Sequence, residues 1–220
     1  MPETVIARLR VNEIFVSIQG ESTWAGRPCV FVRLTGCNLR CTWCDTPYAF
    51  YEGRQMEVPE IVRQVAGYGC DLVEVTGGEP LLQKGVHTLF DSLLAQGRTV
   101  MVETSGERDL SVVDPRVVKI MDLKCPGSGE SHRNRWSNLQ HVGPGDEIKF
   151  VLADRGDYEW MRAAVRERGL ARRTSHLLAS TVFGKLDPRR LVEWVLEDAL
   201  PVRVQVQLHK IIWGADAQGV

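Results

Sequence analysis

Three cysteines lie in one short segment, Cys37-Asn-Leu-Arg-Cys41-Thr-Trp-Cys44, separated by three and then two residues. A loop with these gaps can present three thiolates to one face of an iron–sulfur cluster. A structural metal site normally has four protein ligands, whereas a site with a vacant position is typical of catalysis. The triplet therefore predicts a cluster with one open iron, which can bind a small molecule and pass it an electron.

The main alternative for the triplet is structural zinc. Zinc sites usually combine two cysteine pairs, or a cysteine pair with a histidine pair, and no second pair follows here. The other cysteines, Cys29, Cys70 and Cys125, stand alone, and isolated cysteines are usually small buried hydrophobes. A disulfide scaffold is not expected, because 6 cysteines in 220 residues are too few.

The composition describes an ordinary globular protein. The chain has 220 residues, of which 44% are hydrophobic and 25% charged, with a formal net charge of −1. This charge gives no broad attraction to nucleic acid or to an anionic membrane. No secretory signal and no bilayer-spanning apolar run is visible. We therefore expect a cytoplasmic protein without nucleic-acid or membrane partners.

Short apolar segments alternate with amphipathic helical patterns along the chain. Strands are expected at 30–34, 72–76, 99–103, 117–123, 147–152, 177–180 and 202–208, and helices at 59–66, 86–94, 158–168 and 188–196. This alternation predicts an α/β fold with a parallel sheet and right-handed crossovers. The connections 105–114 and 125–146 are poor in helical pattern, which indicates an incomplete parallel (β/α) barrel of about six strands. We expect a single domain, 1–220, in which an N-terminal extension, 1–28, packs on the partial barrel. Within the extension, 5–17 is expected to form an extra strand or hairpin.

Polar residues stand at the ends of most predicted strands. In parallel α/β folds the carboxyl ends of the strands gather the functional groups at one edge. Each residue alone is weak support, but one cavity would receive all of them. They are Arg33, Thr76, Glu103, Asp122 with Lys124, Ser180, and Gln207 with His209 and Lys210.

The turn Gly77-Gly78-Glu79-Pro80 follows one of these strands directly. Two glycines let a backbone approach a ligand closely, and proline makes the exit rigid. A plain glycine turn is the alternative. Beside a cysteine triplet, the turn favours a ligand-binding interpretation.

These residues resemble the radical S-adenosylmethionine (SAM) superfamily. The resemblance rests on the cysteine triplet, on Trp43 before its last cysteine, and on the turn 77–80. It implies a radical-SAM-type fold and a [4Fe–4S] cluster on Cys37, Cys41 and Cys44. The open iron would bind SAM and cleave it reductively to a 5′-deoxyadenosyl radical. The residues then expected to contact SAM are Trp43, Gly77, Gly78, Glu79, Lys124 and Ser180.

Over nearly the whole chain the sequence is also similar to the 7-carboxy-7-deazaguanine synthase family of queuosine and 7-deazapurine biosynthesis. The similar stretches include 19–22, 44–46, 103–106, 122–126 and 207–210. The resemblance implies a lyase that converts 6-carboxy-5,6,7,8-tetrahydropterin to 7-carboxy-7-deazaguanine with loss of ammonia. It also implies assistance by Mg²⁺, a flavodoxin or ferredoxin as electron donor, and a homodimer.

The same resemblance assigns roles to particular side chains. Arg33 would hold the substrate carboxylate, for which its planar fork is suited, and Thr46 would be the Mg²⁺ ligand. A pterin edge offers adjacent donors and acceptors that amide, carboxylate and imidazole groups can read. The complete set expected to bind substrate is Gln19, Glu21, Arg33, Thr76, Glu103 and His209.

The end of the chain departs from part of this family. Some members end soon after the histidine, with a terminal carboxylate at the substrate, whereas this chain continues through 211–220. Trp213 or Asp216 could close the pocket instead. Two alternative functions remain open at this point: a radical SAM glycyl-radical activase, and a metal-stabilised, non-enzymatic binding module.

Overall fold

The computed structural model describes residues 6–220, and their strands form one nine-stranded sheet in the order β3-β1-β2-β4-β5-β6-β7-β8-β9. From β2 through β9 every neighbouring pair is parallel. At the other end, β1 pairs antiparallel with both β2 and β3. The bounds are β1 (Arg8–Ile18), β2 (Pro28–Leu34), β3 (Arg54–Glu57), β4 (Leu72–Gly77), β5 (Thr99–Thr104), β6 (Val118–Asp122), β7 (Glu147–Leu152), β8 (Leu177–Thr181) and β9 (Arg203–Val204).

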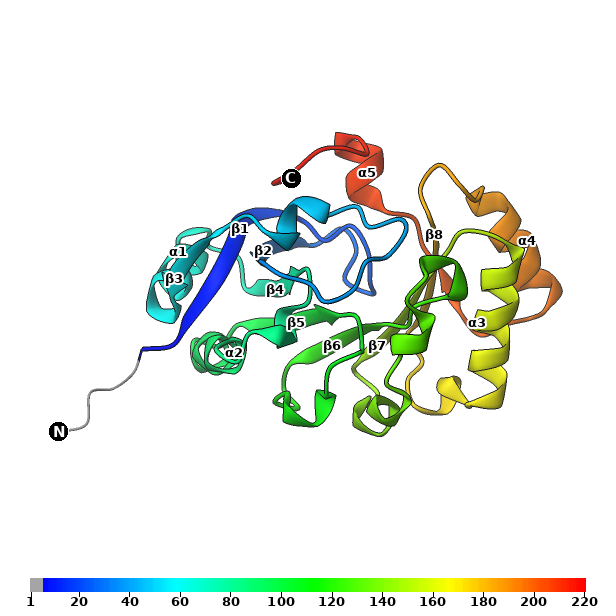
Figure 1. Cartoon of the computed structure of the whole chain (residues 1–220), viewed down its shortest axis with the longest axis horizontal. Helices are drawn as coiled ribbons and strands as arrows, with labels where there is room; N and C mark the ends of the chain where they lie inside the picture. The colour runs from blue at the N-terminus through cyan, green and yellow to red at the C-terminus, as the bar shows by residue number, and fades with distance from the viewer. Residues whose placement is uncertain (1–5) are drawn as a thin grey trace.

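Within residues 6–220, four α-helices cover the sheet, and a fifth, α5, lies beside the cavity at the carboxyl ends of the strands. Figure 1 shows α3 and α4 side by side outside β7 and β8, with α1 and α2 toward the other end of the sheet. The short α5 lies on the same side as the segment that follows β2. The bounds are α1 (Val58–Gly67), α2 (Val86–Ala95), α3 (Arg155–Glu167), α4 (Pro188–Glu197) and α5 (Leu208–Trp213).

Local sequence explains where the covering helices begin. Asp154 accepts the N–H of Asp157 at 3.0 Å and so caps α3, which satisfies a donor that the first turn leaves free. Asp187 caps α4 in the same way through Arg189, and Pro188 occupies the first turn, where its missing N–H costs nothing.

The two faces of the sheet carry different residues because side chains alternate along each strand. On the face beneath the helices lie Val30 and Val32 of β2, Val73 and Val75 of β4, and the equivalent positions of later strands, all in the main apolar core. The opposite face is apolar only toward the amino ends of the strands, where a small cluster contains Cys29, Phe31, Leu72, Met101 and Ile120. Further along the same face, the strands carry charged side chains that line a cavity.

The predicted fold class is confirmed, because six long parallel strands, β2 and β4 to β8, alternate with helices as expected. The connections after β5 and β6 contain only short 3₁₀ helices. In the N-terminal segment β1 joins the sheet between β2 and β3; residue 5 of the predicted strand lies outside the described residues.

One predicted strand is wrong in its bounds. A strand was expected over 202–208, but β9 ends at Val204, and His209 lies in the first turn of α5. After Gln205 donates to Ala179 of β8, the chain leaves the sheet, and the N–H of Leu208 donates to the Gly20 carbonyl at 2.9 Å. The alternating valines of this segment predicted a longer strand, but only Arg203 and Val204 pair with β8.

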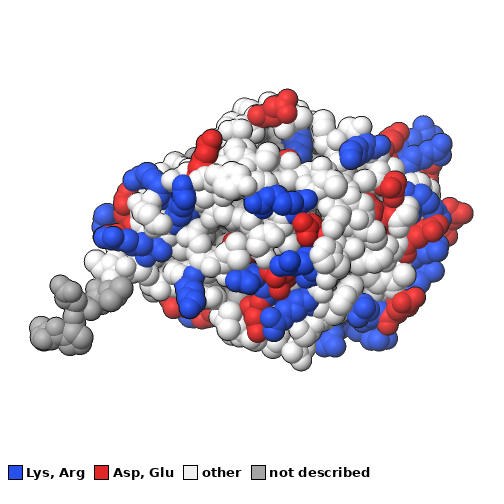
Figure 2. Space-filling view, in the orientation of Figure 1, with Lys and Arg blue, Asp and Glu red and all other residues white. Residues whose placement is uncertain are grey.

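The surface shows no dominant charge on the face in view. Lys and Arg side chains are interspersed with Asp and Glu (Figure 2), in line with the formal net charge of −1. Within residues 6–220, no helix has the length and apolar character needed to cross a bilayer.

Candidate active site

A cavity of about 610 Å³ opens at the carboxyl ends of the parallel strands. It receives side chains from β2, β4, β5, β6 and β7, from the cysteine loop, and from the C-terminal segment. Of the sixteen predicted site residues, fourteen line it: Gln19, Glu21, Arg33, Cys37, Cys41, Trp43, Cys44, Thr46, Thr76, Gly77, Gly78, Glu103, Lys124 and His209. The two that do not are Glu79 and Ser180.

The cysteine loop joins β2 to the 3₁₀ helix Pro47–Phe50, and the Arg40 side chain binds its backbone. Arg40 donates to the carbonyls of Cys37 and Leu39, at 2.9 and 2.6 Å. All three thiols are free, and each is partly exposed. Burial raises the pKa of the Cys41 thiol to about 11, although the nearby Lys124 opposes this shift. Cluster binding would therefore have to displace the proton.

The thiol arrangement fits a cluster better than a single ion. Among residues 6–220, no group of three or more His, Cys, Asp or Glu side chains converges as one metal ion requires. The three thiols instead line one cavity wall. A tetrahedral zinc ion needs its ligands around one point, whereas three thiolates of a cluster bind three separate irons. Cys37, Cys41 and Cys44 would hold that group.

The two glycines of the 77–80 turn are required by close packing. A Cβ on Gly78 would lie 2.3 Å from the Gly36 carbonyl oxygen and 2.6 Å from Cys37 Cβ. A Cβ on Gly77, whose φ is +142°, would lie 2.1 Å from the Leu34 carbonyl oxygen. The turn is thus in direct contact with the entry to the cysteine loop, where only a residue without a side chain fits.

Glu79 has a different position from the one that its motif suggested. Its carboxylate is fully buried and accepts from Ser105 N at 2.8 Å, Ser105 Oγ at 2.6 Å, Leu81 N at 3.0 Å and Thr104 Oγ1 at 3.0 Å. Burial raises its pKa, and these hydrogen bonds oppose the shift. The side chain therefore ties the turn after β4 to the end of β5 and does not face the cavity.

Ser180 also lies away from the cavity. The residue is buried on β8, and its hydroxyl lies 3.5 Å from the carbonyl oxygen of Phe150 in the adjacent strand. Strand alternation does not explain this placement, because Ser180 stands opposite Val151 and two positions before Val182, and both of these residues line the cavity.

Arg33 is fixed by two residues that sequence reasoning missed. Its Nε donates to Glu13 Oε1 at 2.6 Å, and Tyr48 donates its hydroxyl to the same oxygen at 3.1 Å. The guanidinium carbon lies 5.9 Å from the ring centres of Tyr48 and Phe15. These contacts anchor one edge of the guanidinium at the cavity wall.

Buried charges form the floor of the cavity. Lys149 Nζ lies 2.6 Å from Glu21 Oε2 and 2.5 Å from Glu103 Oε1. Gln19 donates its amide to Glu74 and accepts the N–H of Glu21 at 2.8 Å, so both ends of its amide have partners within the protein. Burial raises the pKa of Glu74 well above its ordinary value, whereas Lys149 outweighs the burial of Glu103 and lowers the pKa of that carboxyl.

Asp122 and Lys124 line the cavity near the thiol of Cys41. Lys124 Nζ donates to Asp122 Oδ2 at 2.7 Å. The other oxygen, Asp122 Oδ1, is buried and has no hydrogen-bond partner in the described structure. A buried acceptor without a partner is costly, so this oxygen is available to a donor on a bound ligand such as SAM.

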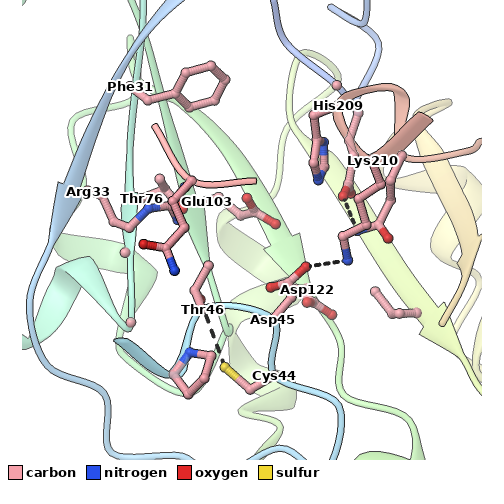
Figure 3. Close-up of a pocket in the computed structure, with 18 of the residues that line it drawn as sticks. Phe31, Arg33, Cys44, Asp45, Thr46, Thr76, Glu103, Asp122, His209 and Lys210 are labelled. Carbon is pink, nitrogen blue, oxygen red and sulfur yellow. Dashed lines mark hydrogen bonds and ion pairs between the residues drawn. The ribbon is translucent and has the colours of Figure 1, made fainter. Parts of the chain in front are cut away.

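The C-terminal segment closes the remaining side. A Cβ on Gly20 would lie 2.2 Å from His209 Nδ1, so α5 packs tightly on the loop after β1. Burial lowers the pKa of His209. Figure 3 shows Lys210 directed at Asp45, and their Nζ–Oδ2 distance is 2.7 Å. Residues 215–220, including Asp216, line the cavity, whereas Trp213 does not.

The class of protein to which the chain belongs follows from a family model and a solved structure. A family model described as the Radical SAM superfamily matches residues 31–122, the span that holds the cysteine triplet and the 77–80 turn. The solved structure of QueE from Escherichia coli has a TM-score of 0.71 at 21% identity, covering 90% of this chain and 94% of that one. The fold and the cysteine loop are therefore those of a radical SAM protein.

Closer relatives define the family. The 7-carboxy-7-deazaguanine synthase of Koribacter versatilis is 48% identical over 96% of this chain and 100% of its own length. That of Chlorobaculum tepidum is 45% identical over 97% and 98%. The chain belongs to the 7-carboxy-7-deazaguanine synthase family of radical SAM enzymes. This confirms the predicted family and enzyme class, and favours them over the activase and binding-module alternatives.

Proposed function

We propose that this protein converts 6-carboxy-5,6,7,8-tetrahydropterin to 7-carboxy-7-deazaguanine with loss of ammonia. The observation that carries the proposal is the presence of Arg33 and of the Lys149-paired carboxylates Glu21 and Glu103 in the same cavity as the cysteine triplet. Membership of the synthase family supports the same substrate and product.

The chain's residues divide the work within this cavity. A cluster bound at the triplet would supply the electron that cleaves SAM, while the protein binds and orients the reactants. Gly77 and Gly78 pack closely on the entry to the cysteine loop and line the cavity where SAM would bind, and Asp122 Oδ1 offers it an acceptor. Trp43 and Lys124 line the same wall.

The substrate would meet complementary groups on the other wall. Arg33 is held through Nε, which directs the remaining nitrogens of the fork to a carboxylate. Glu21 and Glu103 accept N–H groups of the pterin, and His209 is a neutral partner because burial lowers its pKa. Thr76 completes this wall. Gln19 acts mainly by holding the Glu21 backbone.

The proposed function includes Mg²⁺, with Thr46 as its protein ligand. Thr46 lines the cavity two residues after Cys44. One protein oxygen with water and substrate oxygens is a normal shell for this ion. A flavodoxin or ferredoxin electron donor and a homodimer rest on the family resemblance and complete the proposal. A single domain, expected from the length of the chain, is also part of it, with the N-terminal extension packed on the partial barrel; residues 1–5 of that extension lie outside the described residues.

An anaerobic assay of iron- and sulfide-reconstituted protein tests the function. Pterin, SAM, Mg²⁺ and a strong reductant should give 7-carboxy-7-deazaguanine and ammonia. Cleavage of SAM with no such product would refute the proposed substrate while leaving the radical SAM class intact. For the metal, Thr46→Val should abolish stimulation by Mg²⁺ and Thr46→Ser should retain it; equal stimulation in both would exclude Thr46 as a ligand.

A further inference from the structure

Lys149 is the centre of an unusual group of charges on the cavity floor. It lies on β7, with 7% of its side chain exposed, between Glu21 from the loop after β1 and Glu103 from β5. Glu74 of β4 is also buried and lines the same cavity. One ammonium thus pairs with two carboxylates, and a third carboxylate lines the same cavity.

The sheet register brings these residues together. Lys149 stands opposite Asp122 on β6, and Glu103 stands opposite Ile120 on the same strand. Because parallel neighbours in register share a face, the charged side chains of β5, β6 and β7 project on the cavity side. The alternating positions Ile148 and Phe150 are in the apolar core.

Simple charge neutralisation does not account for this arrangement. A buried lysine that only balances charge needs one carboxylate, and Lys119 of β6 shows this case, with Asp146 at 3.1 Å. Lys149 holds two carboxylates at once, and Glu103 keeps 28% of its side chain exposed toward the cavity. The group therefore has accepting capacity that the protein does not use internally.

We propose that Lys149 is a positioning residue that holds Glu21 and Glu103 as two carboxylate acceptors for the N–H groups at the edge of the pterin. The inference rests on the proposed function. Each carboxylate is also held by a second part of the protein. Gln207 donates to Glu21 Oε1 at 2.7 Å, and the backbone of Glu103 is part of β5. Lys149 sets the distance between them.

The consequence of losing the ammonium follows from the low dielectric of the site. Without Lys149, adjacent buried carboxylates repel one another, and one of them takes up a proton. A protonated carboxyl presents a donor where the substrate also presents a donor. Substrate binding then weakens, while Cys37, Cys41 and Cys44, which would hold the cluster, lie on the loop after β2, outside this group of charges.

The test compares Lys149→Met with Lys119→Met in reconstituted holoenzyme. The two lysines are equally buried, at 7% and 5% side-chain exposure, and lie on adjacent strands, but Lys119 does not line the cavity. Iron content, SAM cleavage without pterin, and KM and kcat for the pterin are measured for each. Lys149→Arg, which keeps the charge, is the conservative variant.

We expect Lys149→Met to raise KM for the pterin about 10–100-fold, the range for one or two lost charged contacts. Its iron content and its substrate-free SAM cleavage should stay near those of the wild type. Lys119→Met should leave KM unchanged, and Lys149→Arg should recover most of the loss. In a Glu103→Gln background, Lys149→Met should have a much smaller further effect, because it acts through that carboxylate.

Two results would overturn the inference alone: a pterin KM in Lys149→Met within twofold of wild type, or an equal rise in Lys119→Met. A parallel loss of iron or of substrate-free SAM cleavage in Lys149→Met would show a structural role instead. A wild-type enzyme that cleaves SAM but neither binds nor converts the pterin would overturn the proposed function, and this inference with it.

Discussion

Glu79→Gln tests whether the carboxylate of the 77–80 turn is a structural tie. Oε1 accepts the Leu81 N–H and Oε2 accepts the Ser105 N–H. In either orientation, a Gln amide would therefore turn an NH₂ group toward a backbone donor. A buried donor left without an acceptor costs about 1–3 kcal/mol, and charge-assisted bonds are lost as well. Removing a buried charge offsets part of this cost, so we expect a net destabilisation of about 2 kcal/mol.

The measurement is denaturant and thermal unfolding of the metal-free protein. For a chain of this size, about 2 kcal/mol corresponds to a fall in Tm of roughly 4–8 °C. Glu57→Gln is the control, because the Glu57–Arg8 pair is exposed and such pairs contribute about 0–1 kcal/mol. If Glu79→Gln unfolded at the wild-type denaturant concentration with the same slope, the buried network would not stabilise the turn.

Three further predictions follow from the site. Arg33→Lys should raise KM for the pterin about tenfold or more with iron content unchanged, since the planar fork is lost; an unchanged KM would exclude Arg33 as the carboxylate site. Gly78→Ala should reduce iron bound per chain, because its Cβ would lie 2.3 Å from the Gly36 oxygen, whereas a Cβ on the control Gly67 meets nothing within 4 Å; equal iron in both would refute the packing argument. Burial, with Glu103 and Glu21 as like charges, raises the pKa of Glu74 above 4.5. The folded state therefore keeps a proton that the unfolded chain releases, so the stability due to Glu74 is complete below that pH and lost as pH rises. Unfolding at several pH values above 4.5 should thus show wild type losing stability relative to Glu74→Gln as the pH rises; a constant difference would mean that Glu74 titrates normally.

The parallel strands could be predicted because they are buried on both faces near the core. Segments such as 72–76 and 147–152 are short and rich in β-branched residues, which is typical of such strands. The edge strand β3 was missed because its sequence, Arg-Gln-Met-Glu, has only one buried residue. Its pairing depends on β1 rather than on its own composition.

Some cavity residues could likewise be predicted from the sequence, whereas others could not. The cysteine triplet, the glycine turn and Arg33 were accessible because their types and spacing or their strand-end positions carry information. Lys149 and Glu74 were missed because each lies within an apolar strand pattern, which by itself indicates only a buried strand. The available signal was the alternation itself, since a charge inside a two-sided buried strand requires a partner or a cavity on its face.

Glu13, Tyr48 and Asp45 could not be identified from spacing, because their roles come from contacts between distant segments. Asp45 pairs with Lys210, 165 positions later, and no local pattern predicts this pair. The pair has a structural consequence, because Asp45 directly follows Cys44 and Lys210 is part of α5. It ties the segment that closes the cavity to the loop that presents the thiols. A change in the position of the cysteine loop can therefore reach the C-terminal side of the cavity through this ion pair.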